Sequence, residues 1–128
     1  MERHVGILAI LYSLWGALAM LVGVSLLLLS AGALAILFGP DGSAVEFAAG
    51  VTATAFAAMG LVAVAWGAVH IGASVLLRRR HPGGRVLTLG LAVVNLLVLP
   101  FGTALGAYAL WILLTDSGRR LFEPAAVV

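Results

Sequence analysis

Two polar side chains lie in apolar stretches where they could do chemistry, and the first is His70. It is the only acid, base or histidine deep inside an uncharged stretch, and an intramembrane histidine can transfer protons or ligate a haem iron. It lies four residues after Trp66 and eight before Arg78. Tyr12, Trp15 and Trp66 suit an aromatic belt at the same membrane interface. We therefore favour a structural interpretation, a neutral interfacial histidine hydrogen-bonded to a carbonyl.

The second is Asn95, midway through the last apolar stretch. An amide in hydrocarbon has to find a hydrogen-bond partner. We expect an interhelical hydrogen bond, for example to a carbonyl left open near Pro100. The alternative is that Asn95 lines an ion or water path together with Thr103 and Tyr108.

No other pattern in the sequence supports catalysis. Serines and threonines are scattered without a matching base, and there is no cysteine. Neither a phosphate-binding loop nor a cluster of metal-ligand residues is present in the sequence. We therefore predict no enzymatic activity, no catalytic residue, no metal site and no cofactor.

The composition indicates a membrane protein. The 128 residues are 63% hydrophobic and 9% charged, whereas soluble domains carry roughly 25% charged residues. Residues 5–38, 47–77 and 86–115 contain no Asp, Glu, Lys or Arg, and each stretch exceeds the ~20 residues of a bilayer-spanning helix. The net charge of +2 does not suggest nucleic-acid binding, because the basic residues are arginines that flank these stretches.

The arginines predict the orientation, since cytoplasmic loops are rich in basic residues. Residues 78–85 hold four arginines and are predicted to form a cytoplasmic loop. The turn at residues 39–43 has none and is predicted to lie outside. Arg3 then places the N-terminus in the cytoplasm.

The last stretch is interrupted at Pro100, which cannot continue a helix, and Gly102 permits a reversal. A hairpin with its turn at residues 100–103 gives four transmembrane helices, both termini cytoplasmic, and keeps Arg119 and Arg120 inside. A single kinked helix gives three spans instead. We favour the hairpin. Gly102 and Gly106 are four residues apart and are predicted to support close helix packing within the chain.

The predicted architecture is an all-α, polytopic membrane protein with one domain, residues 1–128. We expect helices at about residues 5–38, 44–77, 86–99 and 101–114. An interfacial tail at 115–124 should follow, with a short helix capped by Thr115 or Asp116. Ser43 and Glu46 have the spacing of a capping box for the second helix.

The C-terminal third carries a resemblance. Residues 95–114 read NLLVLPFGTALGAYALWILL, and Leu-Phe-Glu follows at 121–123. This segment resembles the closing hairpin of small, uncharacterised bacterial integral membrane proteins. The resemblance covers less than a third of the chain. It transfers no catalytic residue to this sequence.

These observations favour a non-catalytic role. We expect a multi-pass protein of the bacterial inner membrane that acts as an accessory or structural subunit of a membrane complex. Its expected partners are the lipid bilayer and other membrane subunits or further copies of itself, and not nucleic acid. A small oligomeric channel or transporter is the alternative, and a haem- or quinone-associated membrane subunit comes third.

Overall fold

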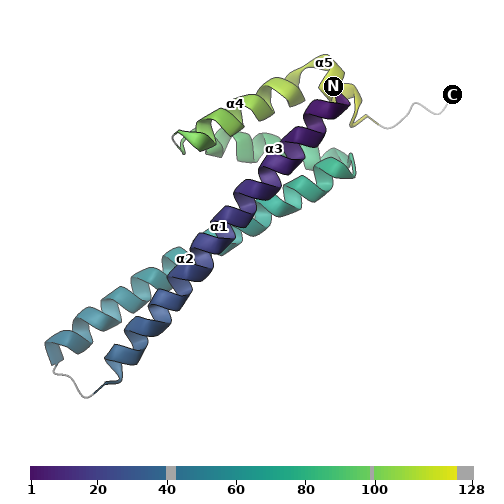
Figure 1. The fold of residues 1–128 in the computed structure, drawn as a ribbon. Helices are drawn as coiled ribbons and strands as arrows, with labels where there is room; N and C mark the ends of the chain where they lie inside the picture. Colours follow the sequence, from purple (N-terminus) through teal and green to yellow (C-terminus); the bar gives the residue numbers. More distant parts are fainter. Residues whose placement is uncertain (40–42, 99, 124–128) are drawn as a thin grey trace. The chain divides into compact units, whose positions relative to one another are not determined.

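The computed structural model describes residues 1–39, 43–98 and 100–123. These residues are helical almost throughout, and no strand occurs among them (Figure 1). The helices are α1 (Glu2–Leu37), α2 (Ser43–Arg78), α3 (Pro82–Asn95), α4 (Phe101–Leu114) and α5 (Asp116–Arg120). The predicted all-α fold is confirmed for this part of the chain.

The helices group into two compact units. Unit 1 comprises Met1–Trp15 with Val69–Val128, and unit 2 comprises Gly16–Ala68. The boundaries fall within α1 and α2, so each of these helices contributes a part to each unit. The single domain expected for residues 1–128 stays a prediction.

Two helices are long and apolar enough to cross a membrane. Glu2–Leu37 has 36 residues, and an 18-residue segment of it has a mean hydropathy of 2.5. Ala44–Arg78 has 35 residues, and the mean hydropathy of such a segment is 1.9. Each helix is about 50 Å long, more than a hydrocarbon core of ~30 Å. Large apolar side chains point outward, and Leu14, Leu28 and Val62 are 67%, 69% and 70% exposed. The two helices are therefore compatible with a membrane protein.

Glycines bring α1 and α2 together in unit 2. A Cβ atom added to Gly67 would lie 2.5 Å from the carbonyl oxygen of Gly16. One added to Gly23 would lie 2.8 Å from the carbonyl oxygen of Gly60. Only a residue without a side chain allows two helix backbones to approach so closely.

Two serines join the same helices by equivalent bonds, one in each unit. In unit 1, Ser74 Oγ donates to the carbonyl oxygen of Ala9 over 2.7 Å. In unit 2, Ser30 Oγ donates to the carbonyl oxygen of Ala53 over 2.8 Å. Both serines are buried, so each hydroxyl is satisfied by the neighbouring helix.

These contacts reveal an internal repeat that the sequence reasoning missed. Small residues recur every seven positions, as Ala9, Gly16, Gly23 and Ser30 in α1 and, in the same order, as Ala53, Gly60, Gly67 and Ser74 in α2. The pairing is antiparallel, so the serine of each series meets the alanine of the other. Seven residues make two helical turns, which keeps the small side chains on one face.

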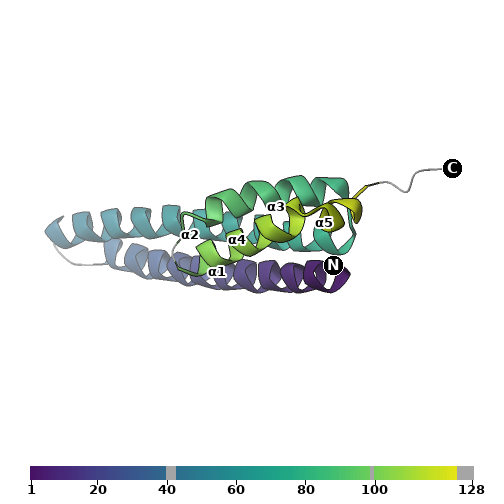
Figure 2. The same cartoon turned by 90° about the horizontal axis from the view of Figure 1, so that it is seen from above.

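α3 and α4 form a short hairpin in unit 1 and lie side by side in both views (Figure 1, Figure 2). α3 ends at Asn95 and α4 begins at Phe101, so Pro100 lies at the interruption, as predicted. A Cβ atom on Gly106 would lie 2.5 Å from the carbonyl oxygen of Ala92. The chain therefore folds back here and does not continue as one kinked helix.

The predicted boundaries of α3 are wrong at both ends. The helix begins at Pro82, within the expected loop, because a proline in the first turn loses no hydrogen bond. His81 caps this end, and its Nδ1 accepts from the amide of Gly83 over 3.1 Å. The helix ends four residues early because Val98 N bonds to Asn95 O in a tighter i to i+3 turn.

The proposed reversal at Gly102 is also wrong. No described glycine has a positive φ, and Gly102 lies within α4. A Cβ atom there would lie 2.7 Å from the carbonyl oxygen of Asn95. Gly102 is thus needed for close packing and not for backbone freedom.

The tail contains the expected short helix, α5. Thr115 holds the N-cap position without a side-chain capping bond, because its hydroxyl donates back to the carbonyl oxygen of Trp111. Phe122 beyond the helix is 5% exposed. Residues 40–42, 99 and 124–128 and the Ser43 side chain lie outside the described part, and the predicted outer turn and capping box fall largely there.

Gly67→Ala is expected to destabilise the protein by about 1–3 kcal/mol, because the added methyl group overlaps the α1 backbone. Gly72→Ala on the same helix is the control, since nothing lies within 4 Å of its Cβ position. It should be neutral or stabilising by up to ~1 kcal/mol, the difference in helix propensity. Reversible unfolding in detergent measures both; equal effects would contradict the glycine contact.

Candidate functional site

Four polar side chains are buried together in unit 1, and we call them the polar cluster. They are Tyr12 on α1, His70 on α2, and Thr88 and Asn95 on α3, each 0% exposed. Thr88 and Asn95 are seven residues apart, which places them on one face of α3. The cluster therefore lies where three helices meet.

A hydrogen bond between His70 and Asn95 forms its centre. Asn95 Nδ2 lies 3.1 Å from His70 Nε2. An amide nitrogen only donates, so His70 Nε2 is the acceptor in this bond. The bond links α2 to α3.

Tyr12 connects the first helix to this pair. Its ring stacks on that of His70, with centroids 5.3 Å apart and planes inclined by 25°. Its hydroxyl donates to the backbone carbonyl of Thr88 over 3.4 Å. Tyr12 thus contacts α2 through its face and α3 through its hydroxyl.

Two polar atoms of the cluster have no hydrogen-bond partner among the described residues. They are Asn95 Oδ1 and Thr88 Oγ1, both buried. An unpaired polar atom in an apolar environment costs a few kcal/mol, about 1–3 from protein mutants. An amide oxygen and a hydroxyl can both bond a water molecule or a small polar solute. The cluster can therefore hold helices together and also take a polar guest.

The sequence singled out His70 and Asn95 separately, and the structure brings them together. The expected interhelical hydrogen bond of Asn95 is present, with the His70 ring as its partner. His70 is fully buried, and its interfacial position stays a prediction. Tyr12 and Thr88 were not recognised as part of a site. The seven-residue spacing from Thr88 to Asn95 is the one sequence signal that could have found Thr88.

The internal repeat allows us to compare Tyr12 and His70 with the residues at the equivalent positions of unit 2. The repeat counterparts of Tyr12 and His70 are Phe56 and Leu26 in unit 2. Apolar side chains at these positions show that pairing α1 with α2 does not itself require a tyrosine or a histidine. Unit 1 differs in also containing α3. Tyr12 and His70 therefore occur in the unit where they contact α3, His70 through Asn95 and Tyr12 through the backbone of Thr88.

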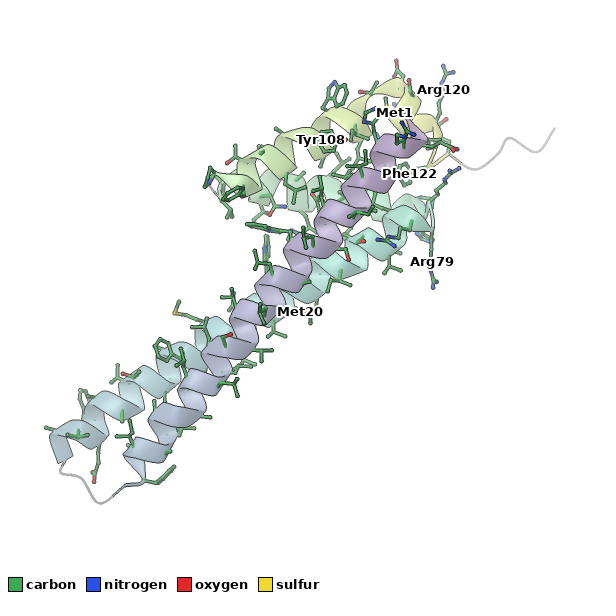
Figure 3. The ribbon with its side chains drawn as sticks, in the orientation of Figure 1. Met1, Met20, Arg79, Tyr108, Arg120 and Phe122 are labelled. Atoms are coloured by element: carbon green, nitrogen blue, oxygen red, sulfur yellow. The ribbon has the colours of Figure 1, made fainter. Side chains whose placement is uncertain are left out.

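The other predicted pore-lining residues make bonds in the same unit. Thr103 Oγ1 donates to the carbonyl oxygen of Leu96 over 2.9 Å, across the α3–α4 turn. The Tyr108 hydroxyl lies 3.2 Å from His4 Nδ1, and Figure 3 shows Tyr108 on α4. The rings of His4 and Trp111 are nearly perpendicular, at 82°, with centroids 6.0 Å apart. These bonds give Thr103 and Tyr108 structural partners.

The polar cluster contains one histidine, His70. Within residues 1–39, 43–98 and 100–123, no three His, Cys, Asp or Glu side chains gather closely enough to hold a metal ion. The contacts of the cluster include two hydrogen bonds and one ring stacking.

Asn95→Leu is expected to lower the free energy of unfolding by about 0.6–2 kcal/mol, because it removes the bond between α2 and α3. His70→Leu and the double variant complete a mutant cycle, with an expected coupling of about 0.6–1.7 kcal/mol. Unfolding in detergent provides the values. Ser25→Ala is the control, since Ser25 is exposed and bonds only within its own helix. Strictly additive effects of the two leucine substitutions would show that the pair does not interact.

Comparison with known proteins adds no family to this geometry. No protein-family model matches the chain, and no curated protein or solved structure matches it. The functional argument therefore rests on the side chains and helices themselves.

Proposed function

We propose that the chain is a multi-pass protein of the bacterial inner membrane that serves as a non-catalytic accessory or structural subunit. One observation carries this proposal. Buried polar side chains bond to neighbouring helices, as at Ser30, Ser74 and the His70–Asn95 pair, while large apolar side chains cover the outside. Polar groups used in this way stabilise a helix bundle within hydrocarbon.

The proposed topology has four crossings, with both termini in the cytoplasm. Figure 3 shows Met1, Arg79 and Arg120 at one end of unit 1. Basic residues are retained on the cytoplasmic side of a membrane, which supports a cytoplasmic location for this end of unit 1.

α3 and α4 supply the third and fourth crossings. Each has 14 residues, about 21 Å of helix against a ~30 Å hydrocarbon core. A bilayer can thin around a short pair, or the pair can enter and leave from one side. Either arrangement returns the C-terminus to the side of the N-terminus.

The α3–α4 hairpin also exposes large apolar side chains that a partner subunit could cover. Leu97, Phe101 and Trp111 are 82%, 73% and 59% exposed on it. Lipid chains or an apolar helix of another subunit can cover such residues. This supports a role within a larger membrane assembly.

A small oligomeric channel or transporter is the second candidate. The observation that favours it is the pair of unpartnered atoms, Asn95 Oδ1 and Thr88 Oγ1. Such atoms can bind a passing water molecule or polar solute. A haem- or quinone-associated subunit ranks third, and a visible absorbance spectrum of the purified protein tests for haem.

A reporter fused after Val128 tests whether the number of crossings is even. We expect cytoplasmic-type fluorescence from a fluorescent protein and no activity from periplasmic alkaline phosphatase. The same reporters fused after Phe38 form the control and should give the opposite result. Phosphatase activity after Val128 would instead mean an odd number of crossings.

Purification in mild detergent tests the accessory role. We expect a stoichiometric complex with another membrane protein or with further copies of the chain, measured by light scattering and mass spectrometry. Proteoliposomes of the wild type and of Asn95→Leu should show equal ion flux, no higher than protein-free vesicles. A monomer without partners would contradict the subunit role, and flux that Asn95→Leu changes would favour the channel.

A further inference from the structure

We propose that a pocket at the arginine-rich end of unit 1 binds the phosphate group of an anionic phospholipid. The inference rests on the membrane location proposed above. It goes further in assigning one lipid class to one set of side chains.

The pocket has a volume of about 200 Å³ and lies where α1 begins and α2 ends. Its lining includes Glu2, Val5, Leu77, Arg78, Arg80 and Leu121. One part of this lining is charged and the other is aliphatic. A phospholipid has the same division, with a phosphate next to the start of its acyl chains.

The charges in the pocket match a single negative phosphodiester. Arg80 Nη2 lies 2.8 Å from Glu2 Oε1, so this pair is neutral as a whole. Arg78 makes no ion pair with another described residue. Its guanidinium therefore provides the net positive charge, and it can bond two phosphate oxygens at once. A zwitterionic lipid would add a cation next to these arginines.

The backbone at Arg80 is further evidence that its side chain has a role. Arg80 has φ 51°, in the left-handed region. It ends α2 in a Schellman motif, with His81 N bonded to Leu76 O and Arg80 N bonded to Leu77 O, both over 3.1 Å. Glycine adopts this conformation without strain. The Arg80 side chain pairs with Glu2 and lines the pocket together with it.

Lipid retention by the full chain tests the proposal. The protein is placed in nanodiscs of mixed phosphatidylglycerol and phosphatidylcholine, and the lipid kept after mild delipidation is counted by native mass spectrometry. We expect one retained phosphatidylglycerol per wild-type chain. Arg78→Gln should reduce retention about tenfold, because it removes the charge-assisted hydrogen bonds to the phosphate. Arg79→Gln removes the same charge from a residue outside the pocket lining and should reduce it less than twofold.

Each further outcome has a defined meaning. Equal losses in both variants, or none in either, overturn the site. If the circular dichroism of Arg78→Gln shows that this variant has lost its helices, the wild-type measurement alone tests the proposal. A wild-type protein that retains phosphatidylglycerol no better than phosphatidylcholine overturns it. Inorganic phosphate that binds the protein in phosphatidylcholine discs, with the same sensitivity to Arg78→Gln, assigns the pocket to free phosphate and also overturns it. Failure of the wild type to insert into any disc would instead refute the membrane location.

Discussion

The close approach of the α1 and α2 backbones is the constraint on which unit 2 depends. Within unit 2, Gly16 and Gly23 of α1 face Gly67 and Gly60 of α2, with no room for a Cβ atom at three of them. In the proposed membrane location, hydrophobic burial gives little driving force between helices, so close packing and interhelical hydrogen bonds would hold the pair. Glycine supplies the packing, and Ser30 supplies a bond to Ala53.

Hydrogen bonds between buried polar groups and neighbouring helices also connect the helices of unit 1. There, Ser74 bonds to the α1 backbone, and His70 bonds to Asn95 on α3. The repeat makes the comparison informative, because the counterparts of Tyr12 and His70 are Phe56 and Leu26. Two similar helical segments have thus acquired different environments. Only the segments that pack with a third helix carry the aromatic–imidazole pair.

The arginines, like the polar cluster, are concentrated in unit 1. Every arginine of the chain belongs to the residues of unit 1, and the ion pairs Arg80–Glu2 and Arg119–Glu123 lie there as well. In the proposed membrane location, the same arginines can set the orientation and bind lipid phosphates, because both effects depend on positive charge at the bilayer surface.

The sequence by itself determined the helical class, the two long apolar helices and the interruption at Pro100. These features follow from composition and from proline's missing amide, which act locally. The sequence also marked His70 and Asn95 as polar groups needing partners. It did not predict that they meet, or that Tyr12 and Thr88 join them, because contacts between helices depend on which faces pack together. The register of the glycines in α1 and α2 and the early end of α3 at Asn95 were likewise decided by tertiary packing, where one backbone occupies the space that a side chain would need.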